Sequence, residues 1–248
     1  MYKDLKNKNV IITGGVGFLG TQIVNAFIKS KSNVFVLDIK KKKNRKKLKY
    51  LKCDITDEKQ IKEALLKIKK VDVLINNAAN DYHPDKLNKK NFFENFDLNM
   101  WEKDLKVGLT GTMLCTKIFG KQMARKRGGI ILNISSDLGI IAPNQDLYAH
   151  KKSKKPVSYS VIKHGIIGLT KYTAAYWSNS GLRCNAIAPG GIFNNQDKLF
   201  LKKIKKQIPM KRMAKRNEYN DLVLFLCSSS SSYITGATIV ADGGRSII

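Results

Sequence analysis

The sequence predicts an α/β fold, a doubly wound parallel sheet of seven strands in a single domain that covers residues 1–248. Three observations predict it. Short apolar runs of strand length alternate with longer stretches of helical periodicity. The apolar runs are nearly continuous, as in strands buried on both faces, and a glycine-rich turn joins the first of them to the first helix. Together these features are typical of a Rossmann fold, in which ligands bind at the carboxyl ends of the strands.

The elements follow in alternating order. The first strand, Asn9–Thr13, is wholly buried in character, and the second, Asn33–Asp38, ends on an acid. Further strands are expected at Lys49–Cys53, Val71–Ile75, Gly129–Ser135, Leu182–Ala188 and Thr238–Val240. Helices are expected over about Leu19–Ser30, Glu58–Ile68, Trp101–Arg127, Tyr159–Ser178 and Asn217–Leu226.

The chain is strongly basic, with 46 Lys and Arg residues against 19 Asp and Glu residues and a net charge of +27. The lysines are spread over the whole chain and thicken in tracts such as Lys40–Lys47 and Lys151–Lys155. Because no aromatic-interleaved platform, helix-turn-helix or finger pattern accompanies them, we interpret them as solvated surface and expect no specific nucleic-acid partner.

The sequence lacks several features that would indicate a membrane, a secreted or a metal-binding protein. Its apolar runs fall short of the roughly 20 residues that cross a membrane, and the N-terminus lacks the cleavage site of a signal peptide. The four cysteines are scattered without metal-ligand spacing. We therefore expect a cytoplasmic protein with reduced thiols, no membrane association and no metal.

The glycine turn indicates a dinucleotide site. Residues 13–20 read TGGVGFLG between the first strand and the first helix, so Gly14, Gly17, Phe18 and Leu19 can bring backbone N–H groups to a pyrophosphate. Asp38, at the end of the second strand, can accept hydrogen bonds from the adenosine ribose and would repel a 2′-phosphate. NAD is therefore favoured over NADP, although the run Lys40–Lys43 leaves NADP open.

Further motifs follow in order at the expected strand ends. They include Asp54-Ile55, Asn76-Asn77-Ala78-Ala79, Ser135-Ser136, Tyr159-Ser-Val-Ile-Lys163, Asn185 to Pro189-Gly190 and Asp242-Gly243-Gly244. With the glycine turn, they resemble the compact, single-domain branch of the short-chain dehydrogenase/reductase family over nearly the whole chain.

The resemblance implies roles for these residues. Ser136, Tyr159 and Lys163 would be catalytic, and the last two would also contact the cofactor. The remaining cofactor contacts would come from Asp54, Ile55, Asn77, Ala78, Ala79, Pro189, Gly190 and Ile192. Members of the branch usually assemble, so a homotetramer or homodimer is expected.

The chemistry is consistent with these roles. Hydride transfer at a carbonyl needs a group that gives or takes a proton on the oxygen. A tyrosine with a pKa near 10 is a weak base at neutral pH, but a lysine four residues later lies on the same helical face and lowers that pKa. The Ser136 hydroxyl can bond both the substrate oxygen and the tyrosine.

A second pair with the same spacing, Tyr148 and Lys152, lies closer to Ser136 in sequence. Pro156 interrupts any helix that begins there, whereas Tyr159 and Lys163 lead into a long helical stretch. We therefore assign the catalytic role to Tyr159. Residues 144–156 then form an insertion at the mouth of the site, where Tyr148, His150 and the lysines either contact an anionic substrate or form a solvated loop.

Two positions depart from the family pattern. Phe18 gives the glycine turn the form found in the extended branch, so an NAD-retaining sugar epimerase or dehydratase is an alternative. Gly108 stands where the family has its fourth catalytic residue, an asparagine. Glycine cannot hold the water of the usual proton relay, and a cofactor-binding protein with weak catalysis is therefore a second alternative. Asn99 is not a substitute, being about two helical turns away.

The substrate is expected to be small and polar. The stretch from Ser136 to Thr170 and the Asp242-Gly243-Gly244-Arg245 end resemble bacterial oxidoreductases of flagellin modification and surface-sugar synthesis, which implies a sugar or a sugar phosphate. The segment 192–213, which in the family is the substrate lid, carries Phe193, Asn194, Gln196 and several lysines. These groups suit a polar ligand better than a fatty-acyl one.

Overall fold

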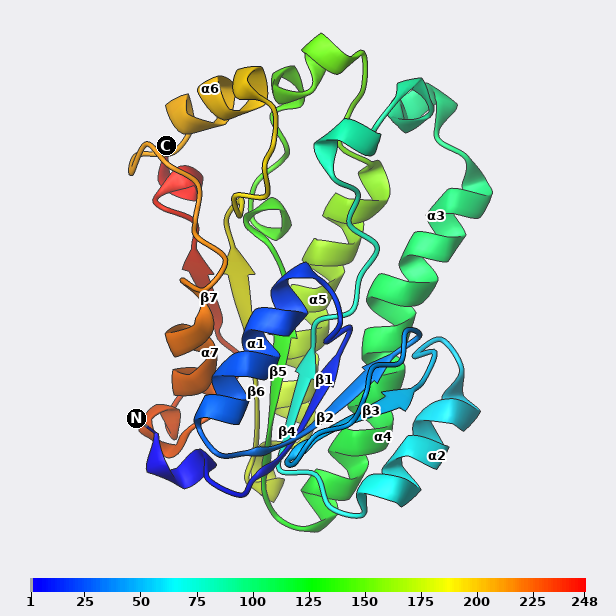
Figure 1. Ribbon diagram of the computed structural model, residues 1–248, viewed down its shortest axis with the longest axis vertical. Coiled ribbons are helices and arrows are strands. Elements are labelled where there is room, and N and C mark those ends of the chain that lie inside the picture. Colours follow the sequence, from blue (N-terminus) through cyan, green and yellow to red (C-terminus); the bar gives the residue numbers. More distant parts are fainter. Residues whose placement is uncertain (1) are drawn as a thin grey trace.

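A seven-stranded parallel sheet forms the centre of the computed structural model, which describes residues 2–248 (Figure 1). The strand order is β3-β2-β1-β4-β5-β6-β7. The strands are β1 Asn9–Thr13, β2 Asn33–Asp38, β3 Leu48–Lys52, β4 Val73–Asn76, β5 Gly129–Ile134, β6 Leu182–Pro189 and β7 Thr238–Ala241. The predicted Rossmann sheet is confirmed; β1 and β2 have the expected bounds, and the ends of the other strands differ from the expected ones by at most two residues.

Helices cover the sheet on both sides. Seven are present in the described chain: α1 Phe18–Lys29, α2 Glu58–Ile68, α3 Leu98–Leu105, α4 Gly111–Arg125, α5 Val157–Tyr176, α6 Lys198–Lys206 and α7 Asn220–Leu226. The apolar side chains of α1 and α7 share one buried cluster with the sheet, and those of α2 and α4 share the other. Along β1, Val10 and Ile12 belong to the first cluster and Ile11 to the second, as expected for a strand buried on both faces.

The region predicted as one helix from Trp101 to Arg127 is instead divided. It begins earlier, at Leu98, and its middle, Lys106–Thr110, forms a π-helical turn between α3 and α4. Such turns are often found at functional sites. Here the turn contains Gly108, the position where the family asparagine was expected.

A third buried cluster lies in the loops beyond the carboxyl ends of the strands. Leu147 and Tyr148 of the insertion pack with Phe200 and Ile204 of α6, a helix that was not predicted from the sequence. Leu147 and Tyr148 are only 2% and 6% exposed. Of the two alternatives for residues 144–156, a solvated loop does not describe Leu147 and Tyr148, because these two side chains anchor the segment to α6.

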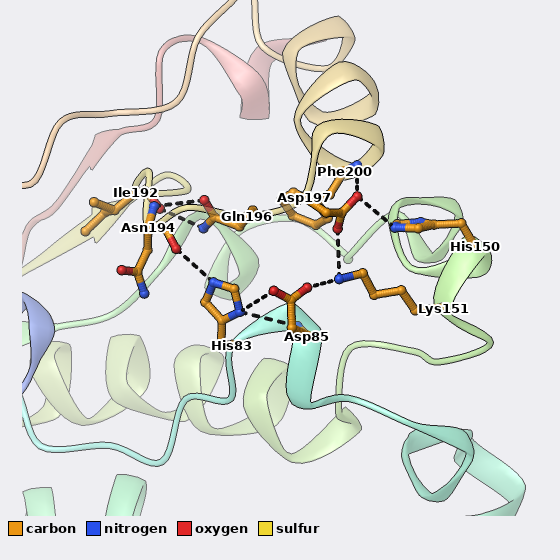
Figure 2. A network of polar contacts seen from close by, with 9 residues as sticks. All are labelled: His83, Asp85, His150, Lys151, Ile192, Asn194, Gln196, Asp197 and Phe200. Carbon is orange, nitrogen blue, oxygen red and sulfur yellow. Dashed lines mark hydrogen bonds and ion pairs between the residues drawn. The ribbon is translucent and has the colours of Figure 1, made fainter.

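The polar residues of the insertion are also paired. Lys151 bonds Asp197 at 2.8 Å and also contacts Asp85, and His150 Nε2 lies 3.1 Å from Asp197 Oδ1 (Figure 2). His83 connects the same network to the carbonyl of Asn194 at 2.9 Å. Three segments far apart in sequence are thus joined near the cavity, and these basic groups already have anionic partners.

Within residues 2–248, no helix combines the length and the apolar character needed to cross a membrane. The same part of the chain contains no group of three or more His, Cys, Asp or Glu side chains arranged to hold a metal ion. The four cysteines are free and buried.

Candidate active site

A cavity of about 740 Å³ opens at the carboxyl ends of the strands. Every catalytic and cofactor-binding candidate chosen from the sequence lines it, from the glycine turn to Ser136, Tyr159 and Lys163. The fold therefore brings together residues that are separated by most of the chain.

The glycine turn is closed tightly enough to exclude side chains. Gly14 has a φ of +63°, and a Cβ there would lie 2.8 Å from the Cα of Ala78. A Cβ on Gly20 would lie 2.2 Å from the carbonyl oxygen of Gly14. The Asn77 amide donates to the carbonyls of Thr13 and Gly14 at 3.0 and 3.1 Å, which fixes the turn against the end of β4.

This turn presents the beginning of α1 to the cavity. No side chain of residues 2–248 caps the helix at Gly17, so the first N–H groups of α1 are available to a ligand. The helix dipole favours a negative charge at that position. The arrangement fits a pyrophosphate.

Asp38 lies beside the turn, at the end of β2. Its carboxylate accepts the N–H of Val16 at 3.0 Å and that of Lys40 at 2.9 Å, and it lines the cavity. Each oxygen thus keeps lone pairs for further donors. A carboxylate held here can accept bonds from ribose hydroxyls, so the residues present fit a nicotinamide dinucleotide.

Ser136, Tyr159 and Lys163 meet at the other end of the cavity. Ser136 follows β5, donates to Asp137 Oδ1 at 2.8 Å and accepts the N–H of Leu138 at 3.1 Å. Lys163 is buried on α5, and its Nζ donates to the carbonyl of Ile134 at 2.9 Å. The same Nζ lies 5.5 Å from the centre of the Tyr159 ring.

Burial dominates the proton affinities here. It raises the pKa of Tyr159 and the Asp81 carboxylate raises it further, while Lys155 and the nearby Ser136 hydroxyl lower it. The net shift of this pKa is upward, so the lowering expected from Lys163 was wrong. Burial also lowers the pKa of Lys163 to about 8. Both shifts favour the uncharged forms, as expected where water is largely excluded.

The comparisons with known proteins agree with this geometry. Residues 17–246 match the family described as "Enoyl-(Acyl carrier protein) reductase". A short-chain dehydrogenase from Leptospira borgpetersenii serovar Hardjo-bovis, solved with bound NAD+, superposes with a TM-score of 0.89 at 32% identity, covering 97% of this chain and 93% of the other. The chain belongs to the short-chain dehydrogenase/reductase family.

Among the relatives that cover the chain almost completely, two are named for sugar-related or surface-protein functions. Post-translational flagellin modification protein A of Campylobacter coli is 29% identical, over 97% of this chain and 98% of its own length. Glucose 1-dehydrogenase 2 of Bacillus subtilis is 31% identical, over 100% and 98%. As a member of this family, the protein is an NAD(P)-dependent oxidoreductase.

For a short-chain dehydrogenase, the placement of Tyr148 is informative. Its ring packs on Phe200, with centroids 5.7 Å apart, and burial raises its pKa. Lys152 is exposed, in a left-handed conformation with φ 48°, just after a short 3-10 turn. Tyr148 and Lys152 therefore do not share a helical face, in contrast to Tyr159 and Lys163.

The missing asparagine has a steric explanation. Gly108 is buried, and a Cβ there would lie 2.7 Å from Cγ2 of Ile162, on the helix that carries Tyr159. Its carbonyl accepts the Thr112 hydroxyl at 2.8 Å. In this chain α5 packs so closely against the turn that no side chain fits at position 108.

Several charged residues in and near the cavity have partners that the sequence did not reveal. Lys155 pairs with Asp81 at 2.7 Å, and Arg245 pairs with Asp137 at 2.8 Å. The buried Asp104 accepts the hydroxyl of Ser158 at 2.7 Å, next to Tyr159. Arg245 and Asp137 directly follow recognised motifs and could have been suspected, but Lys155 lies in a lysine tract that resembles solvated surface.

Proposed function

We propose that this protein transfers a hydride between a bound nicotinamide and a hydroxyl or carbonyl carbon of a sugar or sugar phosphate used in surface-glycan synthesis, with Tyr159 as the proton donor and acceptor. The observation that carries the proposal is the position of Tyr159. It lines the same cavity as the glycine turn, next to Ser136 and with Lys163 one helical turn away.

Each residue of the triad has a separate task. The ordinary pKa of tyrosine already lies well above neutral pH, and burial raises the pKa of Tyr159 further, so the protonated phenol can donate to the oxygen of a carbonyl during reduction. Ser136, which Asp137 and Leu138 hold in place, orients that oxygen by turning its hydroxyl proton from Asp137 toward it. When bound, the nicotinamide supplies or accepts the hydride. Lys163 contributes a cation whose proton is easily released, since burial lowers its pKa to about 8.

A small, polyhydroxylated substrate is supported by the lining of the cavity. His83, Asn194 and Gln196 contribute polar groups, and Lys155 and Arg245 are each paired with a carboxylate. The relatives named for flagellin modification and for glucose dehydrogenation support the same class. Pairing of these cations favours the sugar itself over its phosphate.

Asp38 supports NAD over NADP. Its carboxylate lies where the adenosine ribose would be bound, and a 2′-phosphate there would be repelled. The side chains of Lys40–Lys43 are exposed. We expect NADH to bind at least tenfold more tightly than NADPH, roughly the effect of one uncompensated charge contact.

Two measurements test the proposal. Fluorescence titration with NADH and NADPH tests the cofactor site, and failure to bind either would refute the function. Absorbance at the nicotinamide band, followed with a panel of free, phosphorylated and nucleotide-linked sugars, tests the substrate class. Turnover of acyl thioesters but of no sugar in the panel would contradict it.

A further inference from the structure

Lys155 occupies a constrained position at the mouth of the active site. Its N–H donates to Gln145 Oε1 at 2.9 Å, and Gln145 Nε2 donates back to its carbonyl at 3.4 Å. Pro156 follows and α5 begins at Val157. The backbone is therefore held on both sides, and the side chain, only 10% exposed, lines the cavity.

The ammonium group of Lys155 lies beside an aromatic ring and a carboxylate. Its Nζ lies 3.8 Å from the centre of the Tyr159 ring and 2.7 Å from Asp81 Oδ1. Asp81 comes from the loop after β4, and its side chain is 56% exposed at the same cavity. The insertion thus places a cation, and the β4 loop a carboxylate, against the tyrosine. Lys155 Nζ is closer to this ring than Lys163 Nζ, which lies 5.5 Å from its centre.

We propose that the Lys155–Asp81 ion pair is a positioning element that controls proton transfer at Tyr159, with the lysine favouring loss of the proton and the aspartate opposing it. The inference rests on the proposed role of Tyr159. It gives the insertion a function and supplies a second cation beside the tyrosine in a site that has Gly108 in place of the asparagine.

The other charged groups around Tyr159 do not duplicate this pair. Lys163, on α5, is buried and donates to a backbone carbonyl. Asp137, after β5, is paired with Arg245. Besides burial, Asp81 raises the pKa of Tyr159 and Lys155 lowers it. The two groups also act on Lys163 with opposite signs, Asp81 raising its pKa and Lys155 lowering it.

Opposite signs distinguish this role from a purely structural one. If the pair only held the insertion in place, removing either partner would loosen the cavity and expose Tyr159 in the same way. If the pair acts electrostatically, removing the cation makes the phenol harder to ionise, and removing the carboxylate makes it easier.

The test measures ionisation of Tyr159 without needing a substrate. Tetranitromethane nitrates the phenolate form of tyrosine, and peptide mass spectrometry gives the rate at each site. Tyr233, which is fully exposed, serves as the internal reference, and the cysteines, which the reagent also oxidises, are buried. We compare the wild type with Lys155→Met, Lys155→Arg and Asp81→Asn. Lys154→Met is the matched control, since its Nζ lies over Phe92 and not over Tyr159.

At a fixed pH below the pKa, the nitration rate follows the phenolate fraction, which changes tenfold per pKa unit. We expect Lys155→Met to slow nitration of Tyr159 by on the order of tenfold relative to Tyr233, and Asp81→Asn to accelerate it by a similar factor. Lys155→Arg and Lys154→Met should stay within about twofold of the wild type, a small fraction of one pKa unit.

Acceleration by both Lys155→Met and Asp81→Asn, or no change in either, would overturn the proposal. NADH binding to each variant, measured on separate samples, shows that the fold is intact. A wild type that binds no nicotinamide would refute the proposed function, while the nitration rates would still decide the role of the ion pair.

Discussion

Replacing Gly108 with asparagine, the residue expected from the family pattern, should destabilise this protein. The added Cβ would lie 2.7 Å from Cγ2 and 3.1 Å from Cδ1 of Ile162. Carbon atoms pack at about 3.5–4 Å, so the neighbour has to move by about 1 Å. Cγ2 branches directly from Cβ of a side chain that is 5% exposed, and only a shift of α5 itself can make that space.

The magnitude follows from three contributions. Overpacking of a close-packed interior destabilises by about 1–3 kcal/mol. Burying the amide without an arranged partner adds about 1–3 kcal/mol. Replacing glycine in a helical turn stabilises the helix by at most about 1 kcal/mol, which offsets part of this loss. We therefore expect Gly108→Asn to lower the free energy of unfolding by roughly 2–4 kcal/mol in urea melts.

A double-mutant cycle isolates the contact. Ile162→Ala alone should destabilise by about 2–4 kcal/mol because it leaves a cavity. The double variant should be about 1–2 kcal/mol more stable than the sum of the single effects predicts, because the smaller side chain makes room for the asparagine. Gly108→Asn with unchanged stability, or additive effects in the cycle, would refute the steric explanation.

Three further predictions concern burial and assembly. Burial lowers the pKa of Lys163 to about 8, whereas its unfolded value is near 10.5, so folding releases the Lys163 proton between these two pH values. The buried charge therefore destabilises the fold in full below about pH 8, and this cost is relieved as the pH rises toward 10.5. In urea melts, the difference in unfolding free energy between Lys163→Met and the wild type should be about 2–3 kcal/mol more in favour of the variant at pH 7 than at pH 10. A difference that does not change with pH would contradict the assignment. Arg245→Met leaves the Asp137 carboxylate buried without its cation and should lower the unfolding free energy by about 3–5 kcal/mol, with part regained on adding Asp137→Asn; no loss would show that water reaches this pair. The stacked rings of Tyr172 and Tyr176 are about two-thirds exposed on α5, and we propose that this face joins copies of the chain in a homodimer or homotetramer. Light scattering should then give a smaller mass for the doubly substituted Tyr172→Glu, Tyr176→Glu variant than for the wild type, and a monomeric wild type would exclude the assembly.

The sheet could be predicted because its strands are buried on both faces, which makes their sequences almost continuously apolar. The glycine turn before α1 could also be predicted, because no side chain fits at positions 14 and 20 and the sequence has glycine at both. These features depend on local sequence and on general rules of packing, and the same rules placed the cavity at the carboxyl ends of the strands.

Helix α6 could not be predicted from the sequence. Its sequence, KLFLKKIKK, contains five lysines and resembles solvated surface, and only Phe200 and Ile204 bury their side chains. Their partners, Leu147 and Tyr148, belong to the insertion, about fifty residues earlier. Helicity here depends on tertiary packing that no local pattern reveals.

The environment of Tyr159 shows the same limit. The motif places the tyrosine and Lys163 on one helix, but Lys155 and Asp81 are 74 residues apart and meet only in the folded chain. The π-turn that separates α3 from α4 was likewise hidden, because the helical periodicity continues through it. The sequence predicted which residues line the cavity. The charged groups that surround them come from distant segments and are known only from the folded structure.

We propose that Tyr159, and not Tyr148, moves the proton. The most direct test is the turnover number of Tyr159→Phe and Tyr148→Phe, measured with a sugar that the screen identifies, alongside NADH affinity. We predict that Tyr159→Phe loses about 10²–10⁴-fold in turnover while binding NADH as the wild type does. Tyr148→Phe keeps its packing on Phe200 and should stay within a few-fold of the wild type. Full turnover in Tyr159→Phe, or a comparable loss in Tyr148→Phe with NADH binding intact, would contradict the assignment.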